Sequence, residues 1–229
     1  MIQLAVLILL GASAPLGQKP AGNGKGAVHN PLAVARSFLP PNSKLAQLYR
    51  INYHPRWSVA TRPAVLATHI VSRQSEDLVF AYYSPQIHTF DKTLFVTLLH
   101  PASGGYEQAY TVSYRDQVLL VPDAMRILHL GGWSTSAVAV IAGMGAALGG
   151  HLDVFVWRDP WGWQNIFPPN GGMHYFYFFP KPAGLEVALT YVNHPGLNVS
   201  PPPFWYRWNG KRFVKIPPPK GSSKWPLPD

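Results

Sequence analysis

Tryptophan side chains that could hold a ligand are concentrated around one turn. Trp157, Trp161 and Trp163 surround the Asp159–Pro160 dipeptide, and the strand-like segment 204–208 of the next unit carries further aromatic residues. Exposed rings of this kind can stack on sugars, whereas strand alternation sends at least one set of aromatic side chains into the core. Trp161, in the turn itself, is the best exposed candidate. The candidate ligand-binding residues are Trp157, Trp161, Trp163, Asp159, Trp205 and Trp208.

Carboxylates are the second group that could perform chemistry. Cleavage of a glycosidic bond requires two acids on facing elements. The chain holds ten acidic residues, of which Asp153, Asp159 and Glu186 are the candidates. Each also fits a turn or capping role. A glycan-active hydrolase therefore stays an alternative, although no catalytic residue is predicted.

Metal, cofactor and nucleophile motifs are absent from the sequence. There is no cysteine, and the nine histidines lack the short paired spacing of a zinc site. No Gly-x-Ser-x-Gly elbow occurs, and Gly143–Gly150 lacks the lysine of a phosphate loop. We expect His69 and His129, which occupy matching positions, to have a repeated structural role. No metal and no cofactor are predicted.

The chain is strongly basic, with a formal net charge of +9. Such a charge favours acidic partners. The basic residues are scattered, as on a solvated surface, except for Lys211, Arg212, Lys215 and the segment 220–224. A cell-wall polymer or a protein is the predicted partner, while nucleic acid is not.

The first fourteen residues have the features of a signal peptide. An apolar run from Ile2 to Leu10 is followed by small residues in an Ala-x-Ala pattern. The run is too short for a transmembrane helix, and no later segment is long enough, so no membrane span is predicted in the mature form. We expect a secreted or envelope-associated bacterial protein, with a flexible leader at residues 15–36 and a Pro/Lys-rich tail at 217–229.

Short apolar runs separated by glycine and proline predict an all-β fold for residues 37–216. Residues 32–38 can add a short helix before Pro40, and residues 49–53 a separate strand. The runs recur in the same order three times, with a turn before each fourth strand and an aromatic residue at its start. The predicted strands are 67–71, 78–83, 94–99 and 106–110, then 126–130, 137–142, 152–157 and 163–167, then 175–179, 185–192, 204–208 and 213–216.

A four-strand unit of this size is stable only when it is stacked on neighbours. The segments FWYRWNGKRFVKI (204–216), GGHLDVFVWRDPWGWQNIF (149–167) and SFLPPNSKL (37–45) resemble bacterial exported proteins with FG-GAP/VCBS-like repeats. The resemblance implies three four-strand repeat units in a partial or distorted β-propeller-like arrangement. Such an arrangement is open, closed by oligomerisation, or completed by residues 44–60.

The loops depart from the calcium pattern of that family. The corresponding segments are 72–77, 131–136 and 180–184, and only the first contains acids, Glu76 and Asp77. Two adjacent carboxylates make a poor calcium cage, so no calcium role is transferred to this chain. The sequence predicts a non-catalytic exported module that binds or scaffolds at the cell envelope, with a carbohydrate-binding module as the alternative.

Overall fold

The protein is almost entirely β-structure. The computed structural model describes residues 30–52, 58–84, 93–119, 124–143, 150–170, 174–181, 184–191 and 203–220, and these contain sixteen strands and one helix. The strands form four antiparallel sheets, none of which is closed. The predicted all-β fold is confirmed. The described residues contain no helix with the length and hydrophobicity needed to cross a membrane.

The first sheet is a meander of consecutive antiparallel strands. Its order is β4–β5–β6–β7. The short strand β1 pairs with the same edge of β5 as β4 does. A β-bulge interrupts the pairing of β6 and β7 between Leu98 and Leu99. The strands are β1 (Lys44–Leu45), β4 (Val65–Thr68), β5 (Asp77–Tyr83), β6 (Thr93–Ala102) and β7 (Gly105–Arg115).

The second sheet has the same plan, and the third is a plain four-strand meander. In the second, β8 and β9 both pair with β10, which is followed by β11 and β12. In the third, β13 to β16 pair in chain order. The strands are β8 (Val118–Leu119), β9 (Met125–Leu128), β10 (Ala137–Gly143), β11 (His151–Arg158), β12 (Gly162–Asn165), β13 (His174–Lys181), β14 (Gly184–Tyr191), β15 (Phe204–Trp208) and β16 (Phe213–Ile216).

A hairpin of β2 (Gln47–Asn52) and β3 (Ser58–Pro63) leaves the first sheet between β1 and β4. Three fully buried alanines form its base: Ala46 donates to Ala81, Ala81 to Ala64, and Ala64 to Ala46, each over 2.9 Å between backbone atoms. The described residues of the segment 44–60 other than Ala46 thus belong to β1, β2 and β3, and they do not add a fourth meander. The predicted strand at 49–53 corresponds to β2.

Every other predicted strand overlaps an observed one, but several boundaries differ. Strand β4 ends at Thr68, three residues earlier than predicted, because the amides of Ile70 and Val71 donate to the Asp77 side chain and not to a neighbouring strand. Strand β12 ends at Asn165, whose side-chain oxygen accepts from the amides of Val154 and Phe167. Side-chain acceptors therefore set these boundaries.

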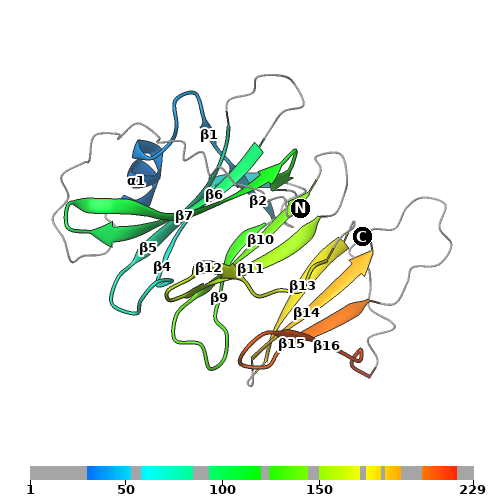
Figure 1. Ribbon diagram of the computed structural model, residues 1–229. Coiled ribbons are helices and arrows are strands. Elements are labelled where there is room, and N and C mark those ends of the chain that lie inside the picture. Colours follow the sequence, from blue (N-terminus) through cyan, green and yellow to red (C-terminus); the bar gives the residue numbers. More distant parts are fainter. Residues whose placement is uncertain are drawn as a thin grey trace, which may run out of the picture.

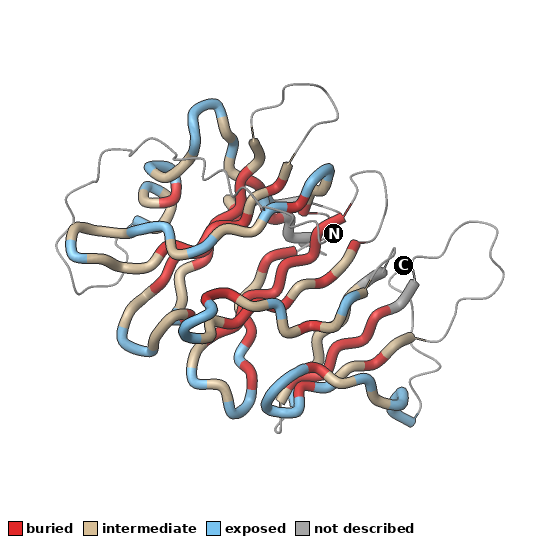
Figure 2. Tube along the Cα trace, viewed as in Figure 1, coloured by how far each residue is buried: buried red, intermediate tan, exposed pale blue. Residues whose placement is uncertain are grey.

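The three meanders lie side by side in chain order (Figure 1). One apolar cluster includes buried residues from all three, and Figure 2 shows the buried strands running through the middle of each sheet. Every residue of β10 is buried. Its sequence, AVAVIAG, combines small and β-branched residues, so that layers can pack closely against both of its faces.

Helix α1 (Pro31–Ser37) covers the outer face of the first sheet. The Asn30 side chain caps it by accepting from the Ala33 amide over 3.0 Å, and Pro31 occupies the first turn. Ala35 packs with Leu78, Phe80, Tyr82 and Leu99 in a second apolar cluster. The short predicted helix is thus present, and residues 31–36, placed in the flexible leader, lie against the sheet. The signal-like segment 1–14, residues 144–149 of the glycine-rich segment and the tail beyond residue 220 are outside the described residues.

Candidate anion-binding groove

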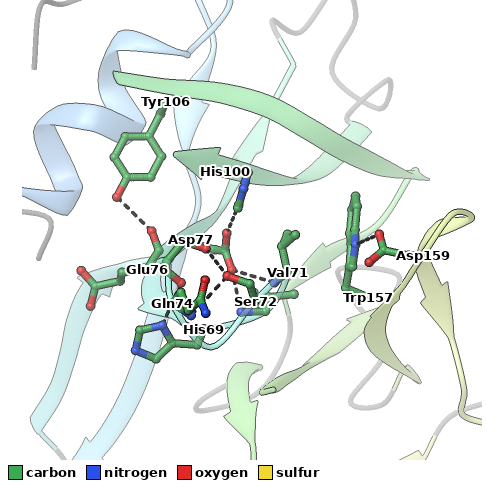
Figure 3. A network of polar contacts seen from close by, with 12 residues as sticks. His69, Val71, Ser72, Gln74, Glu76, Asp77, His100, Tyr106, Trp157 and Asp159 are labelled. Atoms are coloured by element: carbon green, nitrogen blue, oxygen red, sulfur yellow. Dashed lines mark hydrogen bonds and ion pairs between the residues drawn. The ribbon is translucent and has the colours of Figure 1, made fainter. Parts of the chain in front are cut away.

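The turn tryptophans have very different exposures. Trp161 is 70% exposed, whereas Trp163 is 3% exposed and packs against the rings of Phe155 and Tyr110. Trp157 is partly buried, and its indole N–H donates to the Asp159 carboxylate over 2.8 Å (Figure 3). The turn therefore presents one exposed tryptophan ring together with Asp159.

The two candidates in β15 belong to the core. Trp208 is 1% exposed, its indole N–H donates to the Gly131 carbonyl over 2.8 Å, and its ring meets Trp133 edge-on at 6.1 Å. Trp205 is 2% exposed and stacks on Phe179 with ring centroids 5.2 Å apart. Neither ring has a face available for a sugar.

Of the three candidate acids, Asp159 bonds to Trp157 in the exposed turn, whereas Asp153 and Glu186 lie on faces of different sheets. Asp153 points towards the first sheet and accepts a hydrogen bond from Tyr114 of that sheet. It also accepts one from Asn165, which belongs to the second sheet, as Asp153 does. Glu186 is paired with Arg207 at 2.7 Å. Its neighbours Leu185 and Val187 point into the shared core, so Glu186 lies on the opposite face of β14, away from the second sheet. Sheets therefore separate these two carboxylates.

The segment 72–77 corresponds to the first calcium-binding loop of the family that the chain resembles. Its buried carboxylate is bonded to other groups of the chain. Asp77 is fully buried, and one carboxylate oxygen accepts from the amides of Ile70 and Val71 over 2.6 and 2.7 Å. The other oxygen lies 2.6 Å from Nδ1 of His100 (Figure 3). No group of three potential metal ligands occurs among the described residues.

A groove of about 620 Å³ lies where the second and third sheets meet. Sequence reasoning did not identify this site. Its walls come from the ends of β11 and β12, from the segment after β12, and from β15, β16 and the turn between them. The residues that line it are Arg158, Gln164, Asn165, Ile166, Phe167, Pro168, Tyr206, Lys211, Arg212, Phe213, Val214 and Lys215.

The β15–β16 turn holds two of the basic residues in place. The Asn209 side chain accepts from the amides of Lys211 and Arg212 over 3.0 and 2.9 Å, and Gly210 adopts a φ of +91° that favours glycine. This is the Asn-Gly turn that the sequence predicts between two apolar runs. Lys211 and Arg212 are exposed at the rim of the groove.

Arg158 reaches the groove from the neighbouring sheet. Its terminal nitrogen donates to the Lys211 carbonyl over 3.1 Å, and its guanidinium lies over the Trp133 ring at 5.2 Å. Its Nε–H is buried without a hydrogen-bond partner in the described part of the chain. A buried charged donor without a partner is costly.

The groove is positively charged and partly apolar. Four of its described lining residues are cationic and none is a carboxylate. The rings of Phe167, Tyr206 and Phe213 pack together in its wall, with centroid separations of 5.1 and 5.0 Å. Apolar walls lower the local dielectric constant and strengthen attraction for an anion. The sequence showed the cluster of Lys211, Arg212 and Lys215, but the contribution of Arg158 depends on sheet packing.

No protein-family model, curated protein or solved structure matches this chain. The groove is therefore the feature on which a functional proposal rests. It combines charge, shape and an unpartnered donor in one place.

Proposed function

We propose that the protein is a non-catalytic, exported binding module of the cell envelope that holds an anionic wall polymer in the groove. One observation carries the proposal: Arg158, Lys211, Arg212 and Lys215 converge on one groove without a carboxylate among its described lining residues. The net charge of +9 supports it, because the field of the whole chain attracts polyanions towards the groove.

We propose further that the three meanders are FG-GAP/VCBS-like repeat units in a partial β-propeller. The first two sheets support this through a shared detail, since Ala81 donates to Ala64 and Ile141 donates to Ala124 at corresponding points of β5 and β10. In this proposal the repeats serve as a scaffold, and binding has moved from loop calcium sites to the boundary between two sheets.

Binding of the mature chain to purified cell wall tests the function. The double variant Lys211→Gln/Arg212→Gln removes two charges at the rim, and neither side chain has a described polar contact that the fold requires. We expect binding to fall about tenfold in the variant, and wild-type binding to be lost near 1 M salt, where the screening length is only about 3 Å.

The matched control is Arg36→Gln/Lys44→Gln, which removes the same two residue types at exposed positions outside the groove. It should bind as the wild type does. Equal losses in both variants would show that net charge alone causes binding, and wall from which anionic polymers have been extracted should retain little protein. Unchanged binding by the groove variant would reject the proposal.

A carbohydrate-binding module is the second candidate, because Trp161 is 70% exposed in the turn that follows the groove residue Arg158. Competition by free neutral sugars and loss of binding in Trp161→Ala would support this candidate. Loss of binding in salt without competition by sugars would support the anion-binding proposal.

A further inference from the structure

A second cavity, of about 340 Å³, lies between the first two sheets. It is formed by the β4–β5 loop and the β9–β10 loop, which lie next to each other and are tied by a bond of 2.6 Å from the Ser136 amide to the His69 carbonyl. The residues that line it are His69, Arg73, His129, Leu130, Trp133, Ser134, Thr135 and Ser136.

This cavity also lacks carboxylates among its described lining residues. Two acids lie next to this cavity in the chain: Glu76 is not among the residues that line it, and Asp77 is fully buried and bonded to Ile70, Val71 and His100. Arg73 is exposed, and its Nε–H donates to the Ser134 carbonyl over 2.6 Å, which leaves its terminal N–H groups for a ligand.

The histidines and hydroxyl groups of the cavity add further polar groups. Nδ1 of His69 lies 2.8 Å from the Ser75 carbonyl, and because a carbonyl only accepts, Nδ1 carries the hydrogen. The Ser136 hydroxyl is paired with Thr68 at 2.9 Å, whereas Ser134 is exposed at the cavity. A guanidinium together with hydroxyl donors suits phosphate oxygens in particular.

One residue that lines the groove is in contact with one that lines the second cavity. Trp133 lines the smaller cavity, and Arg158, whose guanidinium lies over the Trp133 ring, lines the groove. Trp208 holds Trp133 in place, because its ring contacts the Trp133 ring edge-on and its indole N–H donates to the carbonyl of nearby Gly131. A ligand that extends from the groove past Arg158 would therefore approach Trp133, which lines the second cavity.

We infer that the ligand is an extended phosphate-bearing polymer that occupies both cavities at once and crosses from one to the other at Arg158 and Trp133. This inference rests on the proposed function and specifies its ligand. The polymer would contact three sheets, and its binding would gain from two linked sites on one chain.

Titration calorimetry with inorganic tripolyphosphate and with long-chain polyphosphate tests the inference. Tripolyphosphate should bind two molecules per protein, and each of the variants Arg73→Gln and Lys211→Gln/Arg212→Gln should lose one of them. Long-chain polyphosphate should span both cavities, and either variant should weaken it about tenfold.

Two controls keep the result interpretable. Arg73→Lys retains the charge but loses the planar donor group that reaches Ser134, so it should bind long-chain polyphosphate more weakly than the wild type does but more tightly than Arg73→Gln does. Arg36→Gln, an exposed arginine on α1, should change nothing. Near-ultraviolet circular dichroism reports whether each variant keeps its aromatic packing.

The possible failures are distinct. If Arg73→Gln leaves long-chain binding unchanged while the groove variant weakens it, the second cavity is not used and only this inference falls. If neither variant weakens binding, the proposed function falls as well. Binding to phosphatidylglycerol vesicles but not to polyphosphate would identify a lipid surface as the ligand, and it would reject the inference that the ligand is a polymer.

Discussion

Tyr114 of β7 donates its hydroxyl hydrogen to Asp153 of β11 over 2.8 Å and thereby joins the first sheet to the second. The opposite oxygen of Asp153 accepts from Asn165 over 2.6 Å, and the Tyr114 side chain is 7% exposed. Burial raises the pKa of Tyr114 far above its ordinary value, and the nearby Asp153 charge raises it further.

This pair predicts loss of stability in alkali. The pKa of Tyr114 is higher in the folded than in the unfolded chain. The contribution of Tyr114 to the free energy of unfolding is therefore complete below about pH 10 and declines as the pH rises further. Urea unfolding at about pH 8 and about pH 11 measures the decline.

The variant Tyr114→Phe should be less stable at about pH 8 by about 1 to 3 kcal/mol, because Asp153 loses a donor, and its stability should depend less on alkaline pH. A residual dependence should remain from Tyr82 and Tyr106, since burial raises their pKa values too. An unchanged alkaline slope in the variant would contradict this assignment.

Asp77 should be among the most important side chains for stability. Replacement by alanine would leave the buried amide of Ile70, the amide of Val71 and the His100 ring without their acceptor. We expect Asp77→Ala to cost about 3 to 5 kcal/mol in urea unfolding. The control is Asp116→Asn: its side chain is 46% exposed and its φ is +55°, which asparagine tolerates, so its effect should stay within about 0.5 kcal/mol.

Gly150, just before β11, should not tolerate a side chain. A Cβ there would overlap the Ala142 carbonyl oxygen of β10, and a backbone atom in a sheet centre cannot move away cheaply. Gly150→Ala should therefore destabilise the protein by about 3 kcal/mol or more. At Gly132 a Cβ meets nothing within 4 Å, so Gly132→Ala should cost only about 1 to 2 kcal/mol from its φ of +76°. Equal thermal shifts for the two variants would disprove the predicted overlap at Gly150.

Replacement of Trp163 should lower stability, whereas replacement of the exposed Trp161 should affect only binding. Trp163→Ala should cost about 3 to 5 kcal/mol, because it empties a site packed against Phe155 and Tyr110. Trp161→Ala should change the unfolding free energy by about 0.5 kcal/mol or less, since the side chain is 70% exposed. Thermal unfolding followed by circular dichroism compares them, and a large loss in Trp161→Ala would mean that this ring has a structural partner.

Most strands were predictable because their signals are local. The apolar runs of β5, β10 and β15 and the Asn209–Gly210 turn between β15 and β16 are visible in the sequence, and each lies where it was predicted. Strand ends were less predictable, as at Thr68, because they depend on an acceptor several residues away, namely Asp77.

The face on which an aromatic residue lies could not be predicted. Alternation along β11 separates Val154 and Val156 from Phe155 and Trp157, but the second sheet lies between two others, so both faces are largely buried. The candidate groove was missed for the same reason: Arg158 joins Lys211 only through packing of the second sheet against the third. Pairs of this kind lie far apart in the chain and leave no short-range pattern.

Strand β10 has β9 and β8 along one edge and β11 along the other, and its residues share one apolar cluster with the first and third sheets. Its amides can exchange only when β10 separates from the strands beside it, which would open this shared core. They should therefore exchange with deuterium only through complete unfolding, and more slowly than those of the edge strands β7 and β16. The three sheets would then unfold in a single cooperative transition, and no sheet would persist as an independent domain after the others are lost.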